Sequence, residues 1–159
     1  MTADCRLTVT VRPAGDAAEV EAARELRIAV FCDEQGVPRE LEFDGKDEQA
    51  TQMVALDESG IVATCRLRYP EAEETRDTQG MSGVAKLERM VVDRRLRGRG
   101  VGAKLLAGSE EEARRAGAAT MVLNAQLTAR DFYTSNGYAP EGEIFMDADI
   151  EHVRMTKAL

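Results

Sequence analysis

A short segment rich in arginine and glycine constrains this chain more than any other part. Residues 94–103 read RRLRGRGVGA. They follow residues 84–92, which predict a strand, and they open a helix-like stretch that runs to about Ala116. Glycines at the first turn of a helix let an anion approach backbone N–H groups, and the helix dipole and the arginines add attraction. We therefore predict a phosphate site at this arginine-glycine turn.

Composition limits the class of protein. A chain of 159 residues is predicted to form one domain, residues 1–159, and 43% hydrophobic with 31% charged residues is typical of a soluble globular protein. The formal net charge is −8 and the arginines are concentrated in one segment, which favours a small anionic ligand over nucleic acid. The sequence shows neither a membrane span nor a secretory signal, so we expect a cytoplasmic protein with no membrane partner. Three widely spaced cysteines predict reduced thiols rather than disulfides or a zinc site.

Hydrophobic periodicity and turn residues divide the chain into alternating elements. Strands are predicted at 6–12, 51–57, 61–69, 84–92, 119–124, 138–146 and 151–158, and helices at 17–32, 101–116 and 128–136. Residues 33–48 are predicted to form a loop with one short helical turn, and residues 70–83 a mobile loop. On the helix over 101–116, we predict two i,i+4 ion pairs on the outer face, Glu110 with Arg114 and Glu111 with Arg115.

The order of these elements predicts the fold class. The strand at 84–92, the helix after the arginine-glycine turn and the strand at 119–124 form a βαβ unit, so these two strands should be parallel and joined right-handedly. The other strands are expected to pair as antiparallel hairpins. We therefore predict an α/β fold with a mixed, mostly antiparallel sheet, one central parallel pair, and helices on both faces.

Three motifs together resemble a known family. Residues 97–102, RGRGVG, match the pattern R-x-x-G-x-G; the strand KLERMVV precedes them, and LNAQLTARDFYTSNGY follows about 25 residues later. The chain thereby resembles the GNAT superfamily of acyl-CoA-dependent N-acyltransferases. VFCDEQGVPRELEFD (30–44) and GEIFMDADIEHVRM (142–155) are similar to a bacterial subgroup that includes the ElaA-like proteins, whose substrate is poorly defined.

Other phosphate-binding motifs fit less well. Gly98, Gly100 and Ala103 also satisfy the dinucleotide fingerprint G-x-G-x-x-A. A dinucleotide site would need an acidic residue at the end of the next strand, where Asn124 stands, and residues 113–130 contain no Asp or Glu. The P-loop pattern is absent. The remaining alternative for the arginines is a solvated patch, but the interleaved glycines favour a ligand site.

The resemblance implies a site for acetyl-CoA and no metal. It places the pyrophosphate on the backbone N–H groups of residues 97–102, with the side chains of Arg97 and Arg99 as partners. Arg94 and Arg95 would either reach the 3′-phosphate or face water. The pantetheine arm would pair with the strand backbone, and Asn124 would either bind this arm or cap its strand. The implied donor-binding residues are Met90, Val91, Val92, Arg97, Gly98, Arg99, Gly100, Val101, Gly102, Ala103, Asn124 and Tyr133.

The resemblance implies a proton donor, and the chemistry of an amine acceptor calls for a base. Tyr133 would protonate the departing thiolate, although it would also suit a packing role. An amine with a pKa of about 10.4 costs about 4.6 kcal/mol to neutralise at pH 7, so a base is needed. Glu88 is the first candidate, with a salt bridge to Arg66 or Arg89 as the alternative. His152 is a second candidate base or a substrate ligand, unless it is structural.

The acceptor side is less defined. In the family, the loop after the first helix borders the acceptor pocket, so Glu34 and Gln35 are candidates to bind a cationic amine; the alternative is a solvated acidic loop. A backbone N–H near Met90 or Val91 would stabilise the oxyanion. We expect direct acetyl transfer to a small-molecule or protein amine in a ternary complex, in a possible homodimer. The alternative is a non-catalytic acyl-CoA sensor. A covalent route through Cys32 or Cys65 lacks a neighbouring histidine in the sequence.

Overall fold

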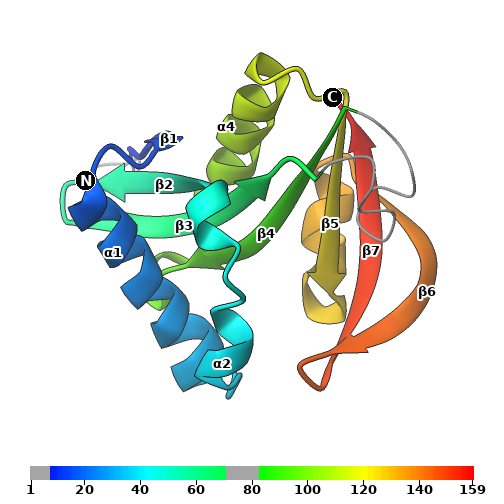
Figure 1. Cartoon of the computed structure of the whole chain (residues 1–159), viewed down its shortest axis with the longest axis horizontal. Coiled ribbons are helices and arrows are strands. Elements are labelled where there is room, and N and C mark those ends of the chain that lie inside the picture. The colour runs from blue at the N-terminus through cyan, green and yellow to red at the C-terminus, as the bar shows by residue number, and fades with distance from the viewer. Residues whose placement is uncertain (1–7, 71–82) are drawn as a thin grey trace, which may run out of the picture.

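One mixed sheet organises the part of the chain that the structure describes. The structure is a computed structural model, and it describes residues 8–70 and 83–159 (Figure 1). The strand order in the sheet is β1-β2-β3-β4-β5-β7-β6. The strands are β1 (Thr10–Pro13), β2 (Thr51–Asp57), β3 (Gly60–Arg68), β4 (Val84–Val92), β5 (Thr120–Gln126), β6 (Ala139–Asp147) and β7 (Ile150–Ala158). The start of the predicted first strand and the predicted loop at 70–83, apart from its two end residues, lie outside the described residues.

The only parallel pair among the described strands is β4 with β5, and helix α4 (Val101–Arg115) connects them. All other neighbouring strands pair antiparallel, so the predicted fold class and central βαβ unit are confirmed. The β4–β5 ladder is short, because it ends at the pair Leu87–Leu123 while both strands continue. Figure 1 shows the two strands diverging beyond that point.

The first helix changes its geometry along its length. Asp16 is the N-cap of helix α1 (Ala17–Arg27), and its side chain accepts a hydrogen bond from the Glu19 N–H. It continues as a π-helical segment, η1 (Ile28–Glu34), so the predicted helix over 17–32 is confirmed with a wider last part. The segment predicted as a loop carries the short α2 (Arg39–Glu42) and the 3₁₀ turn η2 (Asp47–Gln49).

Three shorter elements complete the fold. A 3₁₀ turn, η3 (Arg94–Leu96), follows β4 directly. Another, η4 (Leu127–Ala129), follows β5 and leads into α5 (Arg130–Ser135). The end of β5 and the start of α5 are therefore separated by one tight turn, which keeps α5 next to the point where β4 and β5 part.

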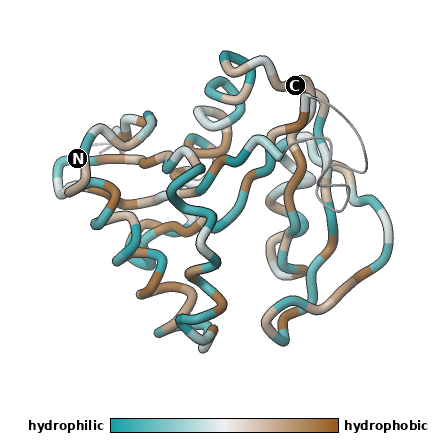
Figure 2. The backbone as a smooth tube through the Cα atoms, in the orientation of Figure 1, coloured by the Kyte–Doolittle hydropathy of each residue, from teal (hydrophilic) through white to brown (hydrophobic). Residues whose placement is uncertain are grey.

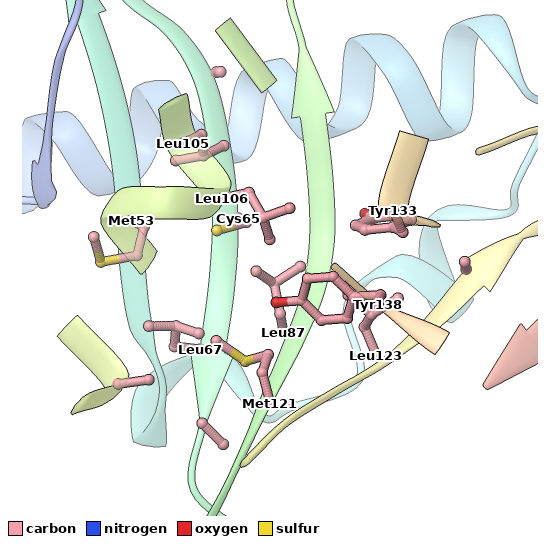
Figure 3. Packing of buried hydrophobic residues seen from close by; sticks show 14 of the residues in the cluster. Met53, Cys65, Leu67, Leu87, Leu105, Leu106, Met121, Leu123, Tyr133 and Tyr138 are labelled. Carbon is pink, nitrogen blue, oxygen red and sulfur yellow. The ribbon is translucent and has the colours of Figure 1, made fainter. Parts of the chain in front are cut away.

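The two faces of the sheet bury different chemistry. On one face, Cys65 and Leu67 of β3 join Leu105 and Leu106 of α4 in the apolar core, which Figure 3 shows in close view. The alternate residues of β3 point to the opposite face, where Arg66 is fully buried beside the segment that follows α1. Figure 2 shows hydrophobic and hydrophilic stretches next to each other along the strands of the sheet.

The predicted outer-face ion pairs of α4 are wrong. Glu110 is buried, accepts a hydrogen bond from the Tyr138 hydroxyl at 2.8 Å, and lies 3.0 Å from Lys157 Nζ. The physical reason is helical spacing, since Glu110 lies four residues after the core residue Leu106 and so shares its face. On the outer face the arginines instead form i,i+3 pairs, Arg114 with Glu111 and Arg115 with Glu112.

At Gly108, helix α4 packs closely against β1. A Cβ at this position would lie 2.4 Å from Val11 Cγ1. Alanine favours a helix over glycine by about 1 kcal/mol, but overpacking costs about 1–3 kcal/mol or more. We expect Gly108→Ala to lower the free energy of unfolding by about 1–2 kcal/mol in urea denaturation, because the steric cost outweighs the propensity gain.

The matched control for this prediction shortens the obstructing side chain. In a Val11→Ala background, Gly108→Ala should cost less than in wild type, because the contact with Val11 Cγ1 at 2.4 Å is gone and only the contact with Cβ at 2.9 Å remains. An equal loss in both backgrounds would contradict the close-packing explanation.

Candidate active site

A cavity of about 930 Å³ lies where β4 and β5 part. Each residue of β4 from Lys86 to Val92 lines it, and from Glu88 onward this strand is no longer paired with β5. Leu123 to Gln126 line it on the β5 side, and the beginning of α4 and α5 close one end. Residues of α2 and of the β6–β7 hairpin line the other end. Figure 1 shows these two elements at the bottom of the view.

Most of the predicted site residues meet in this cavity, although they come from distant parts of the sequence. Those that line it are Gln35, Glu88, Met90, Val91, Val92, Arg97, Gly98, Gly100, Val101, Gly102, Ala103, Asn124, Tyr133 and His152. Glu34 and Arg99 are not among the lining residues, and both are exposed. Arg94 and Arg95 are also exposed, and Arg95 pairs with Asp93.

Strand β4 carries a bulge where it borders the cavity. Thr64 of β3 pairs with Val91 while Arg66 pairs with Glu88, so one residue of β3 stands opposite two of β4. Arg89, one of these two, has a φ of 57°, in the left-handed region that costs a non-glycine residue about 1–3 kcal/mol. No sequence feature predicted this bulge, because arginine has no preference for such a backbone.

The arginine-glycine turn has the backbone that an anion site needs. Gly98 and Gly100 have φ values of 77° and 82°, which other residues adopt only with strain. Gly100 is the N-cap of α4 and offers no side-chain cap. The first N–H groups of α4 therefore have neither an intrahelical partner nor a capping side chain from Gly100, and the positive end of the helix dipole lies beside them.

The side chain of Arg97 is held by the carboxylate of Glu34. Its two terminal nitrogens donate to the two oxygens of Glu34, both at 2.9 Å, and its Nε donates to the Val92 carbonyl at 3.1 Å. The hydrogen bond from Arg97 lowers the pKa of Glu34. Glu34, predicted as an acceptor ligand, thus contacts the arginine-glycine turn.

Gln35 connects the same helix end to β5. Its side-chain oxygen accepts a hydrogen bond from Gln126 Nε2 at 2.9 Å, and both residues line the cavity. The end of the π-helical segment therefore reaches both diverging strands, through Glu34 to the turn after β4 and through Gln35 to the end of β5.

Tyr133 lies beside β4 at the α5 end of the cavity. Its hydroxyl donates to Met90 Sδ at 3.6 Å, and its ring packs edge-to-face with Phe132 and Tyr138. Burial raises the pKa of Tyr133, so the phenol keeps its proton at neutral pH. The residue thus both packs in the core and presents a proton-bearing group next to the cavity.

Glu88 forms the salt bridge that the sequence left as its alternative role. Its carboxylate accepts hydrogen bonds from Arg66 Nη2 at 2.6 Å and from Arg68 Nε. Burial alone would raise the pKa of Glu88, but the charges of Arg66 and Lys86 and these hydrogen bonds outweigh it and lower the pKa. A carboxylate with a lowered pKa is a weaker base.

His152 has a defined orientation on the opposite wall. Its Nδ1 lies 2.7 Å from the Ile150 carbonyl oxygen, and its ring stacks on Phe145 with centroids 5.8 Å apart. A carbonyl oxygen only accepts, so Nδ1 must carry a hydrogen in this contact. In the neutral ring, Nε2 is then free of a proton and able to accept one.

Three arginines and three carboxylates form a closed ring of ion pairs, which we call the ion-pair ring, and three of its members, Glu42, Asp44 and Arg89, line the cavity. Charges alternate around it in the order Arg66, Asp47, Arg27, Glu42, Arg89, Asp44 and back to Arg66. The six contacts measure 3.1, 2.9, 2.6, 3.1, 3.4 and 2.8 Å in that order. Glu88 and Arg68 extend the ring from Arg66.

The ion-pair ring gives partners to three carboxylates of residues 33–48, which we call the acidic loop. Glu42, Asp44 and Asp47 each contact two ring arginines, so these carboxylates are matched internally. Sequence reasoning missed this arrangement. The available signal was the pattern CRLR in β3, which places Arg66 and Arg68 on one face of a buried strand, where each charge requires a partner.

Acid should weaken the ion-pair ring. Burial alone would raise the pKa of Asp44, but hydrogen bonds from Arg66 and from the Lys46 N–H outweigh it and lower the pKa. Its stabilising contribution is therefore present above the unfolded pKa near 3.9 and is lost as the pH falls toward the lower folded value. We expect Asp44→Asn to lose about 1 kcal/mol less unfolding free energy than wild type between pH 6 and pH 3.

Thermal and urea unfolding across this pH range measure the difference. The comparison isolates Asp44 from Glu42, whose pKa burial raises and whose contribution therefore runs in the opposite direction. Parallel pH profiles for the two proteins would show that the Asp44 pairs add no acid-sensitive stability.

The residues that the structure describes form neither a metal-binding cluster nor a helix suited to cross a membrane. No group of three or more His, Cys, Asp or Glu side chains within residues 8–70 and 83–159 is arranged to hold a metal ion. Of the helices formed by those same residues, none is long and apolar enough to cross a membrane.

Comparisons with known proteins agree with this geometry. The model of the acetyltransferase (GNAT) domain family matches residues 17–159. A Bacillus subtilis strain 168 protein, named as the N-acetyltransferase YjcF and itself uncharacterized, is 34% identical over 140 residues, which cover 87% of this chain and 92% of that protein. A crystal structure from Lactobacillus plantarum, provisionally named an N-acetyltransferase, is 29% identical with a TM-score of 0.83 and covers 96% of this chain and 99% of that one. Escherichia coli ElaA shares the fold, with a TM-score of 0.78 at 23% identity over 95% of this chain and 99% of that one.

Proposed function

Because this chain belongs to the GNAT acetyltransferase family, we propose that it moves an acetyl group from acetyl-CoA to an amine by direct attack in a ternary complex. One observation carries the proposal. The cavity follows the unpaired edge of β4, and the arginine-glycine turn lies at the end of that same strand. An extended amide chain with a diphosphate at one end fits this combination of a free strand edge and an anion site.

The donor would lie along β4 and end at the helix start. In this proposal the backbone N–H groups at the start of α4 bind the pyrophosphate, and Arg97 exchanges Glu34 for a phosphate oxygen. The pantetheine amides pair with the open edge between Met90 and Val92. Asn124, exposed on the neighbouring strand and lining the cavity, adds a hydrogen bond to the same arm.

Tyr133 is proposed as the acid that protonates the departing thiolate. Its raised pKa keeps the proton available at neutral pH, and its contact with Met90 places the hydroxyl against the strand edge that would hold the thioester. The state of the cysteines favours direct attack of the amine over a mechanism with a covalent acyl-cysteine intermediate. Burial raises the pKa of Cys65 to about 12 and also raises that of Cys32, so neither offers an activated thiolate.

His152 is proposed as the base that takes a proton from the acceptor amine. The hydrogen bond between Nδ1 and the Ile150 carbonyl leaves Nε2 as the acceptor in the neutral ring, and the residue lines the acceptor end of the cavity. Glu88, the first candidate from the sequence, is bound by two arginines and is the weaker base.

The rest of the proposal concerns the acceptor and the setting. The acceptor is an amine of a small molecule or a protein, acting in the cytoplasm, where the free thiols of Cys32 and Cys65 would stay reduced. A homodimer is proposed through the edge strand β6, which exposes Ile144 and Met146.

Replacing Tyr133 tests the proposed function. Acetyl-CoA should bind wild type and Tyr133→Phe equally in titration calorimetry, because the lost hydroxyl is needed only as the thiolate leaves. The kcat for CoA release with a panel of amines should fall by about 10²–10⁴.

Tyr138→Phe is the matched control, because it also removes a buried phenol hydroxyl but lies outside the residues that line the cavity. It should keep its turnover. Acetyl-CoA binding without turnover of any amine would favour the sensor alternative, and absence of acetyl-CoA binding would reject both.

The base assignment predicts a pH signature. His152→Gln should lower kcat/KM for the amine by about 10²–10³ at pH 7, and the deficit should shrink toward pH 10, where more of the amine is neutral without help. Steady-state kinetics across this range measure it. The same signature in Glu88→Gln, with no pH-dependent deficit in His152→Gln, would move the base to Glu88.

A further inference from the structure

Arg89 has an unusual backbone for its place in the fold. Two other non-glycine residues in the described ranges have positive φ, Ala148 and Asp149, and both lie in the turn between β6 and β7. Positive φ is ordinary in such hairpin turns. Arg89 instead lies inside β4, so its φ of 57° persists only if the surroundings hold it there.

The guanidinium of Arg89 reaches the segment that ends α2. Its Nη2 donates to the Leu41 carbonyl at 3.3 Å and to Asp44 Oδ2 at 3.4 Å. Its Nε lies 3.1 Å from Glu42 Oε2, in an ion pair without hydrogen-bond alignment. These contacts join the bulge of β4 to a different element across the ion-pair ring.

The partners of Arg89 are themselves fixed. Glu42 is buried and accepts a hydrogen bond from Arg27 Nε at 2.6 Å. Asp44 accepts from both terminal nitrogens of Arg66, each at 2.8 Å, and Arg66 is fully buried in β3. Through Glu42 and Asp44, the guanidinium of Arg89 is therefore linked to Arg27 of α1 and to Arg66 of β3.

The bulge determines the edge that β4 offers to the cavity. Backbone groups alternate along a strand with a period of two, so an extra residue sets which groups of residues 90–92 face β3 and which face the open edge. These residues border the cavity on the side where β5 no longer pairs. A shift of the bulge by one residue would exchange the two sets.

We propose that Arg89 is a positioning residue whose side chain holds the bulge, and so sets the backbone edge of β4 that receives the acyl donor. The proposal rests on the proposed function for the identity of that donor. Because the same guanidinium contacts Leu41, Glu42 and Asp44, it also fixes the acceptor-side wall relative to the donor edge. The arginine-glycine turn is not part of this linkage.

Two substitutions at one position separate backbone from side chain. Arg89→Ala and Arg89→Gly remove the same contacts, but glycine adopts a φ of 57° without strain and alanine does not. For Arg89→Ala we expect kcat to fall, and the Kd for acetyl-CoA to rise, each by about 10–100-fold. Arg89→Gly should recover most of both losses. The Kd for ADP, a probe of the arginine-glycine turn alone, should change less than about two-fold in either variant.

A control and a second readout complete the test. Arg115→Ala, on the exposed end of α4, should match wild type and controls for the loss of an arginine. The amide resonances of Met90, Val91 and Val92 in the ligand-free protein should be displaced in Arg89→Ala and restored in Arg89→Gly. This readout decides on Arg89 even if wild type fails to bind acetyl-CoA, a result that would reject only the proposed function.

Two results would overturn the proposal. Equal losses in Arg89→Ala and Arg89→Gly would show that the charge matters and the backbone does not. Wild-type kinetics and amide resonances in Arg89→Ala would show that the side chain holds nothing. If Arg89→Ala does not fold, Arg89→Lys replaces it, because an ammonium cannot reproduce the forked contacts of the guanidinium. Its displaced amides and reduced kcat would support the proposal, and wild-type values would overturn it.

Discussion

Backbone pairing between β4 and β5 ends at Leu87 and Leu123, and the candidate site lies beyond that point. Unpaired strand edges inside a sheet are costly unless another group satisfies them. In this protein the open edge of β4 lies near the start of α4, whose first N–H groups have no intrahelical partner. The strand edge that β5 leaves and the start of α4 meet in one cavity, and an extended, phosphate-bearing donor would pair with both. The proposed binding of the acyl donor follows from this combination of an open strand edge and an uncapped helix start.

The ion-pair ring supports the geometry of that edge. Buried ion pairs add little net stability, because desolvation offsets much of their attraction. In this protein the ion pairs of the ring link α1, the acidic loop, β3 and β4 to one another. The apolar core on the other face, where α4 packs, carries the hydrophobic stabilisation. One face of the sheet thus stabilises the fold, and the other orients the strand edge and the acceptor-side wall.

Local patterns in the sequence predicted the strand, turn and helix around the arginine-glycine turn, because glycine positions and apolar periodicity act over a few residues. The family resemblance indicated Tyr133, whereas Asn124 was chosen for its place at a strand end and His152 as the only histidine of the chain. The ion-pair ring could not be predicted, because its partners are far apart in sequence and pair only after folding. The bulge at Arg89 was hidden for a different reason, since its backbone is held by tertiary contacts against the residue's own preference. Glu34 was expected at the acceptor, and its contact with Arg97 could not be predicted because it depends on the path of the helix end.

A crystal structure of this protein with bound CoA would test the central claim most directly. Our account expects the pantetheine amides to pair with β4 between Met90 and Val92, in the gap left by β5, and the pyrophosphate to contact the N–H groups that begin α4. CoA bound on another surface, or β4 and β5 paired along their full length with the donor excluded from between them, would contradict the account.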